Sequence, residues 1–180
     1  MLDEFIWGNV TRISPEAPVP VVQVRDRTYT AGGAANTAAN VRTLGGRVAV
    51  AGVLGDDAGG RRTREILESQ GVTTAAVVSD PTRPTTTKTR VVAHSQQMVR
   101  IDEEKPGAIP AGVEDRLFEV IAEQLKGARG CVVSDYGKGV VTATLAGRVI
   151  AAANATGVPV VIDPKGTDYV KYRGATLVKP

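Results

Sequence analysis

Two short segments of the sequence combine a carboxylate and an ammonium group with nearby glycines. Asp135 and Lys138 lie in Ser-Asp-Tyr-Gly-Lys-Gly, and Asp163 and Lys165 lie in Asp-Pro-Lys-Gly. A lysine flanked by glycines can reach a phosphate as a point charge, and an aspartate can bind a hydroxyl group. These residues favour binding of a phosphorylated, hydroxyl-rich molecule. Helix capping by Asp135 beside a solvated lysine would also explain the first segment.

A third candidate is the run of small residues Ala31-Gly32-Gly33-Ala34-Ala35-Asn36, which precedes a predicted helix over 37–44. Glycines allow close approach to the backbone, and the free N–H groups of a helix start attract anions. Asn36 adds a donor and an acceptor suited to sugar hydroxyls or phosphate. Tight helix packing would explain the same residues. The run is not the Gly-x-Gly-x-x-Gly pattern of nicotinamide-binding domains.

Two further segments carry polar residues that could contact a ligand. Residues 12–20 contain three prolines, which predict a stiff loop that holds Arg12 in a limited geometry. Residues 96–102 alternate as a strand does, with Arg100 and Asp102 on one face and Val99 and Ile101 on the other. That polar face is either functional or only solvated.

These candidates require elements that hold them together. Short apolar runs predict buried strands, and apolar residues at helical spacing predict crossover helices between them. The predicted strands are 48–54, 130–134 and 158–162, and the predicted helices are 58–70, 113–126 and 142–155. Both Asp/Lys segments follow strands, at the sheet edge where ligands of α/β proteins bind, so we expect the two segments to lie near each other. Residues 18–29 and 85–102 break the alternation and predict antiparallel strands of a small projecting β-layer.

Composition narrows the class of protein. With 42% hydrophobic and 4% aromatic residues in 180, the sequence predicts a soluble α/β domain. The sequence has one cysteine, Cys131, and one histidine, His94, which are too few for a disulfide framework or a Cys/His metal site. The charge of +3 is scattered, so we expect no nucleic-acid partner. We expect no membrane span and no secretory signal either, which predicts a cytoplasmic protein.

Several strings, taken in order, resemble ribokinase-like (PfkB) carbohydrate kinases over essentially the whole chain. Within that family the resemblance is greatest to kinases of D-glycero-β-D-manno-heptose 7-phosphate. The strings are Met-Leu-Asp, Arg-Ile-Ser-Pro-Glu-Ala-Pro-Val-Pro-Val, Gly-Gly-Ala-Ala-Asn, Gln-Gln-x-x-Arg-x-Asp, Ser-Asp-Tyr-x-Lys-Gly and Asp-Pro-Lys-Gly-x-Asp.

The resemblance implies a three-layer αβα fold with a mainly parallel sheet. It also implies a β-lid formed by residues of about 12–30 and 85–102, which covers the sugar and supports a homodimer in the full-length protein. The substrate-binding residues it implies are Asp3, Gly32, Gly33 and Asn36 for the sugar, Arg12, Arg100 and Lys138 for the existing phosphate, and Asp102 and Asp135 as supporting contacts.

The implied reaction transfers the γ-phosphate of ATP, with Mg²⁺, to the anomeric hydroxyl of the sugar phosphate. The family's catalytic base lies in a Gly-Ala-Gly-Asp motif that we expect beyond Pro180, so no catalytic residue is assigned within 1–180. Family members also place a strand before the Met-Leu-Asp string. We therefore expect residues 1–180 to form part of a kinase domain that is inactive alone. The alternatives are another PfkB sugar kinase and a non-catalytic sugar-phosphate-binding module.

Overall fold

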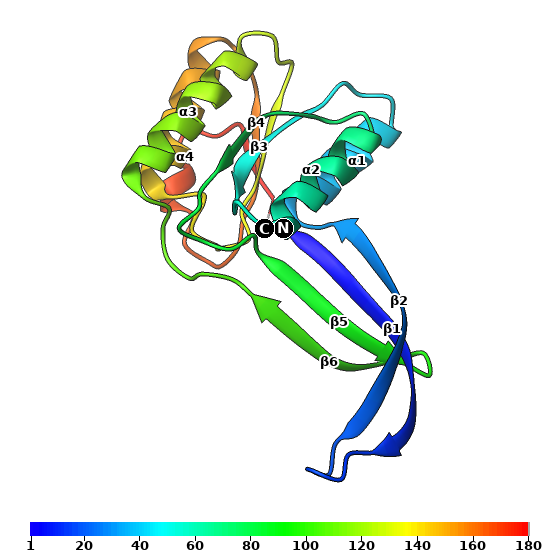
Figure 1. The fold of residues 1–180 in the computed structure, drawn as a ribbon. Helices are drawn as coiled ribbons and strands as arrows, with labels where there is room; N and C mark the ends of the chain where they lie inside the picture. The colour runs from blue at the N-terminus through cyan, green and yellow to red at the C-terminus, as the bar shows by residue number, and fades with distance from the viewer. Residues whose placement is uncertain (180) are drawn as a thin grey trace.

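The computed structural model describes residues 1–179 and contains a layered α/β body with a projecting β-sheet (Figure 1). Its elements are β1 (Leu2–Ile13), β2 (Pro20–Ala31), α1 (Ala34–Thr43), β3 (Ala49–Leu54), α2 (Ala58–Ser69), β4 (Thr73–Ser79), β5 (Thr87–Ala93), β6 (Gln96–Glu103), α3 (Ala111–Leu125), β7 (Cys131–Ser134), α4 (Ala143–Ala155), β8 (Val160–Asp163), the 3₁₀ turn η1 (Val170–Tyr172) and β9 (Leu177–Val178).

The body consists of two sets of parallel strands with helices packed on them. β3 pairs with β4, and β7, β8 and β9 form a second parallel sheet. Buried apolar side chains of α4, including Ile150 and Ala153, pack on Val160 and Ile162 of β8. Leu117 of α3 packs with Leu145 of α4, against partly buried residues of both sheets. The predicted helices are confirmed, with each end no more than three residues from the expected position.

The projecting sheet, called the lid below, has the strand order β2-β1-β5-β6 and extends away from the body (Figure 1). β1 and β2 form a long antiparallel hairpin, and β5 and β6 form a second one. The two hairpins join through a parallel pairing of β1 with β5. Both antiparallel segments are confirmed, but the 12-residue strand β1 is a finding that periodicity did not predict.

The register of the lid sorts its side chains onto two faces. Residues directly opposite one another point to the same face, and neighbours along a strand point to opposite faces. The pairings Asp3 with Lys88 and Lys88 with Asp102 therefore place these three side chains on one face. Arg90 and Arg100 are also paired and lie on that face. Glu4 lies on the opposite face, where it binds Arg27 and Thr89.

Asp57 joins the start of α2 to the start of the lid strand β5. One carboxylate oxygen accepts a hydrogen bond from the Gly60 N–H at 2.7 Å, which caps the helix, and the other accepts one from the Thr85 N–H at 2.7 Å. Burial acts to raise the pKa of Asp57, but these hydrogen bonds outweigh it and hold the pKa below its ordinary value of 3.8. The ionised form of Asp57 is therefore the form that stabilises the fold.

Asp57→Asn is expected to destabilise the chain at pH 7 and to lose this effect in acid. Because the folded pKa is depressed, the carboxylate stabilises the fold above pH 3.8, and its contribution disappears as the pH falls through the lower, folded value. Urea unfolding at pH 7 and at pH 3 measures the difference from the unsubstituted chain. Asp56→Asn, at the exposed neighbouring carboxylate, is the control. An Asp57→Asn difference of equal size at both pH values would contradict the prediction.

Candidate functional site

Three segments distant in the sequence meet around Gly32 and Gly33, at the start of α1. A Cβ on Gly32 would lie 2.1 Å from Oδ2 of Asp3, so the side chain of Asp3 occupies the space that glycine leaves open. Gly33 has φ +61 and precedes the helix, and a Cβ there would lie 3.4 Å from the ring of Tyr136. Asn36, in the first turn of α1, is exposed. The predicted sugar-binding residues of β1 and α1 are thus brought together.

The lid contributes a charged face beside Asp3. Arg90 donates a hydrogen bond to Oδ1 of Asp3 at 2.5 Å, Lys88 binds Asp102 at 2.7 Å, and Arg100 binds the same carboxylate at 2.8 Å. Three cations thus share two carboxylates, which leaves one excess positive charge for an anionic ligand. Burial is slight at Asp102, and its hydrogen bond from Lys88, followed by that from Arg100, keeps its pKa below the ordinary value.

Lys88 and Arg90 are members of this face that the sequence reasoning missed. The available signal was the alternation Thr-Lys-Thr-Arg in residues 87–90, which places both cations on one face of a strand. Arg100 and Asp102 were predicted to share a face, and the direct hydrogen bond between their side chains agrees with this.

Arg12 does not join this group within one chain. It lies in β1 and not in the predicted loop, nine positions along the strand from Asp3. At a rise of 3.3 Å per residue this separation is roughly 30 Å. β1 and β2 carry their far ends well away from the body (Figure 1). We expected Arg12 to bind the same phosphate as Arg100 and Lys138. Within one chain the structure does not bring Arg12 to these two residues, so this expectation is corrected.

The loop after β7 places Asp135 and Lys138 differently from each other. Asp135 is 5% exposed, and its carboxylate is surrounded by internal donors. Burial acts to raise the pKa of Asp135, but hydrogen bonds from Lys171 and Tyr172 lower it below its ordinary value. Lys138 is more open and binds Glu104, just beyond β6, at 2.7 Å. Lys138 thus lies where the lid meets the body, and Asp135 supports the loop from beneath.

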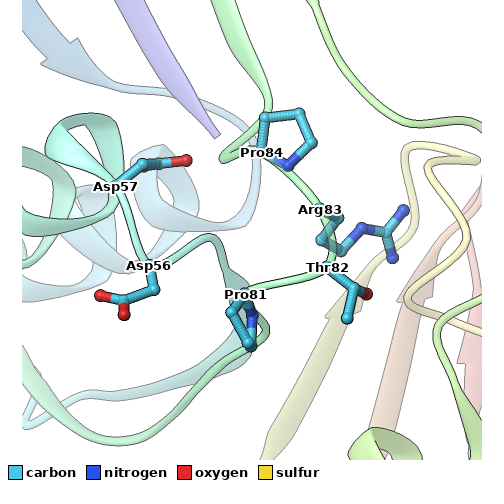
Figure 2. A pocket seen from close by; sticks show the side chains of 6 residues that line it. All are labelled: Asp56, Asp57, Pro81, Thr82, Arg83 and Pro84. Atoms are coloured by element: carbon cyan, nitrogen blue, oxygen red, sulfur yellow. The ribbon is translucent and has the colours of Figure 1, made fainter.

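Arg83 connects the segments that join the lid to the body. Its Nη2 donates to the carbonyl oxygen of Lys105 at 2.8 Å and lies 3.4 Å from the carbonyl oxygens of Gly107 and Lys138. Figure 2 shows Arg83 lining an open pocket between its own loop and the start of α2. The loops before β5, after β6 and after β7 are therefore tied to a single guanidinium group.

The described residues contain neither a metal-binding cluster nor a membrane-spanning helix. Within 1–179, no three His, Cys, Asp or Glu side chains gather as a metal-binding group. In the same range, no helix has the length and apolar character required to cross a membrane. The lone histidine, His94, is hydrogen-bonded to the backbone carbonyl of Val10 at 3.0 Å.

The sequence matches the pfkB carbohydrate kinase family over residues 3–180. The chain belongs to this family. Curated relatives of this pfkB chain include the bifunctional protein HldE of Geobacter metallireducens, which is 49% identical over all 180 residues. HldE of Helicobacter pylori is 42% identical over 178 residues. The pfkB chain spans 37% of the length of the first and 38% of the second.

Solved structures share the fold of this pfkB chain. Phosphofructokinase-2 from Escherichia coli in complex with potassium has a TM-score of 0.69 at 21% identity, covering 99% of this chain and 56% of that one. Ribokinase from Arabidopsis thaliana complexed with ribose and ATP has a TM-score of 0.63 at 21% identity, covering 92% and 51%. These likenesses confirm the predicted ribokinase-like α/β fold with mostly parallel strands in the body.

Proposed function

We propose that this chain is the sugar-binding part of a kinase that phosphorylates D-glycero-β-D-manno-heptose 7-phosphate at its anomeric hydroxyl. The observation that carries the proposal is the 42–49% identity to HldE proteins along the whole chain. The heptose kinase strings in the sequence support the same substrate. The cationic lid face beside Asp3 suits a ligand with both hydroxyl groups and a phosphate.

The residues divide into two proposed roles. Asp3, Gly32, Gly33 and Asn36 bind the sugar, since they supply a carboxylate, open backbone and an amide at a helix start. The 7-phosphate is bound by the cations at the base of the lid. These are Lys88, Arg90, Arg100 and Lys138, with Asp102 and Asp135 as supporting groups.

ATP is the proposed phosphoryl donor, with Mg²⁺ as its companion ion, as in the pfkB family. The described carboxylates do not gather as a metal-binding group, so we assign no residue of 1–179 to magnesium and derive no step through it. The role of this chain is to orient the acceptor hydroxyl and to neutralise the existing phosphate. Such positioning supplies much of the rate acceleration in phosphoryl transfer.

We also propose that the lid pairs with a second copy of the chain in the full-length protein. The lid face opposite Asp3 exposes Val24, Val99 and Ile101, each about half accessible, and a shared apolar face of this kind is typical of symmetric dimers. Sedimentation equilibrium of a chain lengthened to the size of its HldE relatives tests this. A dimer that Ile101→Lys converts to a monomer is expected, whereas a monomeric parent would contradict it.

Binding can be measured on this chain through its single tryptophan. Trp7 lies in the lid on the same face as Asp3, stacked on Phe5 with ring centroids 5.8 Å apart. Titration with heptose 7-phosphate is expected to change its fluorescence at lower concentration than ribose 5-phosphate, fructose 6-phosphate or inorganic phosphate. Tighter binding of another sugar phosphate would favour a different pfkB sugar kinase.

Turnover separates the kinase from the binding module. ATP consumption with heptose 7-phosphate is measured on this chain and on a chain lengthened at both ends to the size of its HldE relatives. We expect turnover only from the lengthened chain. Binding without turnover in both would favour a non-catalytic sugar-phosphate-binding module. Absence of binding and turnover in both would contradict the proposed function.

A further inference from the structure

A second layer of side chains lies beneath the loop after β7. Oδ2 of Asp135 accepts hydrogen bonds from the ammonium group of Lys171 at 2.5 Å and from the hydroxyl of Tyr172 at 2.7 Å. Both donors belong to η1, 36 and 37 residues further along the chain. The ring of Tyr172 is 1% exposed and packs in the core formed by α4 and β8. The donors are thus attached to a packed part of the core of the body.

The other oxygen of Asp135 acts on the loop itself. Oδ1 accepts a hydrogen bond from the Gly137 N–H at 2.7 Å, which closes a tight turn, and Gly137 has φ +67. The backbone N–H of Asp135 donates to the carbonyl oxygen of Asp163 at 2.9 Å. The carboxylate of Asp135 therefore connects η1 to the residues that follow Asp135 in the loop. Without Lys171 and Tyr172, the buried charge of Asp135 would lose two of its three hydrogen-bond donors.

The loop after β7, which Asp135 holds in place, contacts the candidate site at two points. The ring of Tyr136 lies against Gly33, at the start of α1, and Lys138 binds Glu104 at the base of the lid. A shift of this loop would move both contacts together. Displacements of about 1 Å at a binding site can reduce activity by about 100-fold, so the supports of the loop matter to the ligand.

We propose that Lys171 and Tyr172 are positioning residues for sugar-phosphate binding, acting through Asp135 on the Tyr136–Lys138 loop. The proposal rests on the proposed function for its ligand, but the loop geometry can be tested separately. Neither residue lies in the Ser-Asp-Tyr-Gly-Lys-Gly or Asp-Pro-Lys-Gly segments. The two Asp/Lys segments are neighbours, as predicted, yet the cation that binds Asp135 comes from η1 and not from Lys165.

Four variants of the chain test this role. Tyr172→Phe removes one hydroxyl and keeps the buried ring, and Lys171→Met removes the charge and keeps much of the length. Lys171→Arg keeps the charge as the conservative variant. Tyr169→Phe, at a partly exposed tyrosine one turn away, is the matched control. Circular dichroism first establishes that each variant is folded.

Two readouts are taken on each variant. The dissociation constant for heptose 7-phosphate, followed by Trp7 fluorescence, is expected to rise roughly tenfold in Tyr172→Phe and in Lys171→Met. It should stay within about twofold in Tyr169→Phe, and Lys171→Arg should recover most of the affinity. Amide hydrogen exchange at residues 136–139 should quicken in the first two variants, while exchange in β3 and β4 stays unchanged.

The outcomes separate the positioning role from the proposed function. Faster exchange confined to 136–139, together with weaker binding, supports the proposal. Unchanged exchange and affinity in Tyr172→Phe and Lys171→Met would overturn it. Faster exchange in β3 and β4 as well would show a general structural role and would also overturn it. If neither the unsubstituted chain nor the lengthened chain binds a sugar phosphate, the proposed function fails, and the exchange readout alone decides whether η1 positions the loop.

Discussion

Gly139→Ala is expected to lower the melting temperature of the chain by roughly 6 to 12 °C, which corresponds to about 3 kcal/mol in a protein of this size. The backbone at Gly139 has φ +81, which costs an L-residue about 1–2 kcal/mol. The added Cβ would lie 1.8 Å from the carbonyl oxygen of Gly107. Because that atom belongs to the backbone, the two loops must separate, at a further cost of about 1–3 kcal/mol. Differential scanning calorimetry measures the change.

Two other glycines separate the parts of this effect. Gly107 has φ +94 with nothing within 4 Å of its added Cβ, so Gly107→Ala should cost only the backbone part, about 1–2 kcal/mol. Gly147 lies inside α4 in open space, so Gly147→Ala should stabilise the chain by about 0.5–1 kcal/mol. Equal melting temperatures for Gly139→Ala and Gly107→Ala would show that the clash does not occur.

Asp3→Asn is expected to weaken sugar-phosphate binding by roughly 10- to 150-fold. Hydrogen bonds to a charged group contribute about 1.5–3 kcal/mol, and each 1.4 kcal/mol is about tenfold in affinity. The substitution removes the negative charge that pairs with Arg90 at 2.5 Å, so that cation loses its anionic partner. Both effects alter the side of the site that we assign to the sugar. Titration of Trp7 fluorescence with heptose 7-phosphate measures the loss.

Glu4→Gln is the matched control, because the chain offers the same kind of ion pair one residue further along. Glu4 binds Arg27 at 2.8 Å on the opposite face of the lid. If the affinity depends on the face that carries Asp3, Glu4→Gln leaves the dissociation constant within about twofold while it removes a comparable ion pair. Equal losses in both variants would mean that the lid acts through its general stability, and would contradict a sugar-binding role for Asp3.

Local patterns were sufficient to predict most of the body. The helices over α2, α3 and α4 follow from apolar residues at helical spacing. The structure adds that Asp57 and Thr142 cap the starts of α2 and α4, and that Gly71 follows the end of α2. The strands β7 and β8 follow from short apolar runs. The sequence also predicted that the two Asp/Lys segments lie near each other, because adjacent parallel strands bring their carboxyl ends together.

The features that sequence reasoning missed depend on partners distant in the chain. β1 mixes acidic, aromatic and glycine residues, and pairing on both sides with β2 and β5 makes it a strand. Its length also carries Arg12 away from Asp3. Lys171 and Tyr172 belong to no motif that we used in the sequence. Only the packing of η1 beneath the loop after β7 brings them to Asp135. Such contacts are set by tertiary structure and not by periodicity.

The parallel pairing at the centre of the lid also determines when the lid can form during synthesis. Thr89 bonds to Glu4 across 85 residues of chain, so the centre of the lid cannot close until β5 has left the ribosome. About 60 residues separate the end of β2 from the end of β5, which at ordinary elongation rates is a delay of roughly 3 to 12 s. Throughout that time the first hairpin has an open edge, a feature that chaperones can protect.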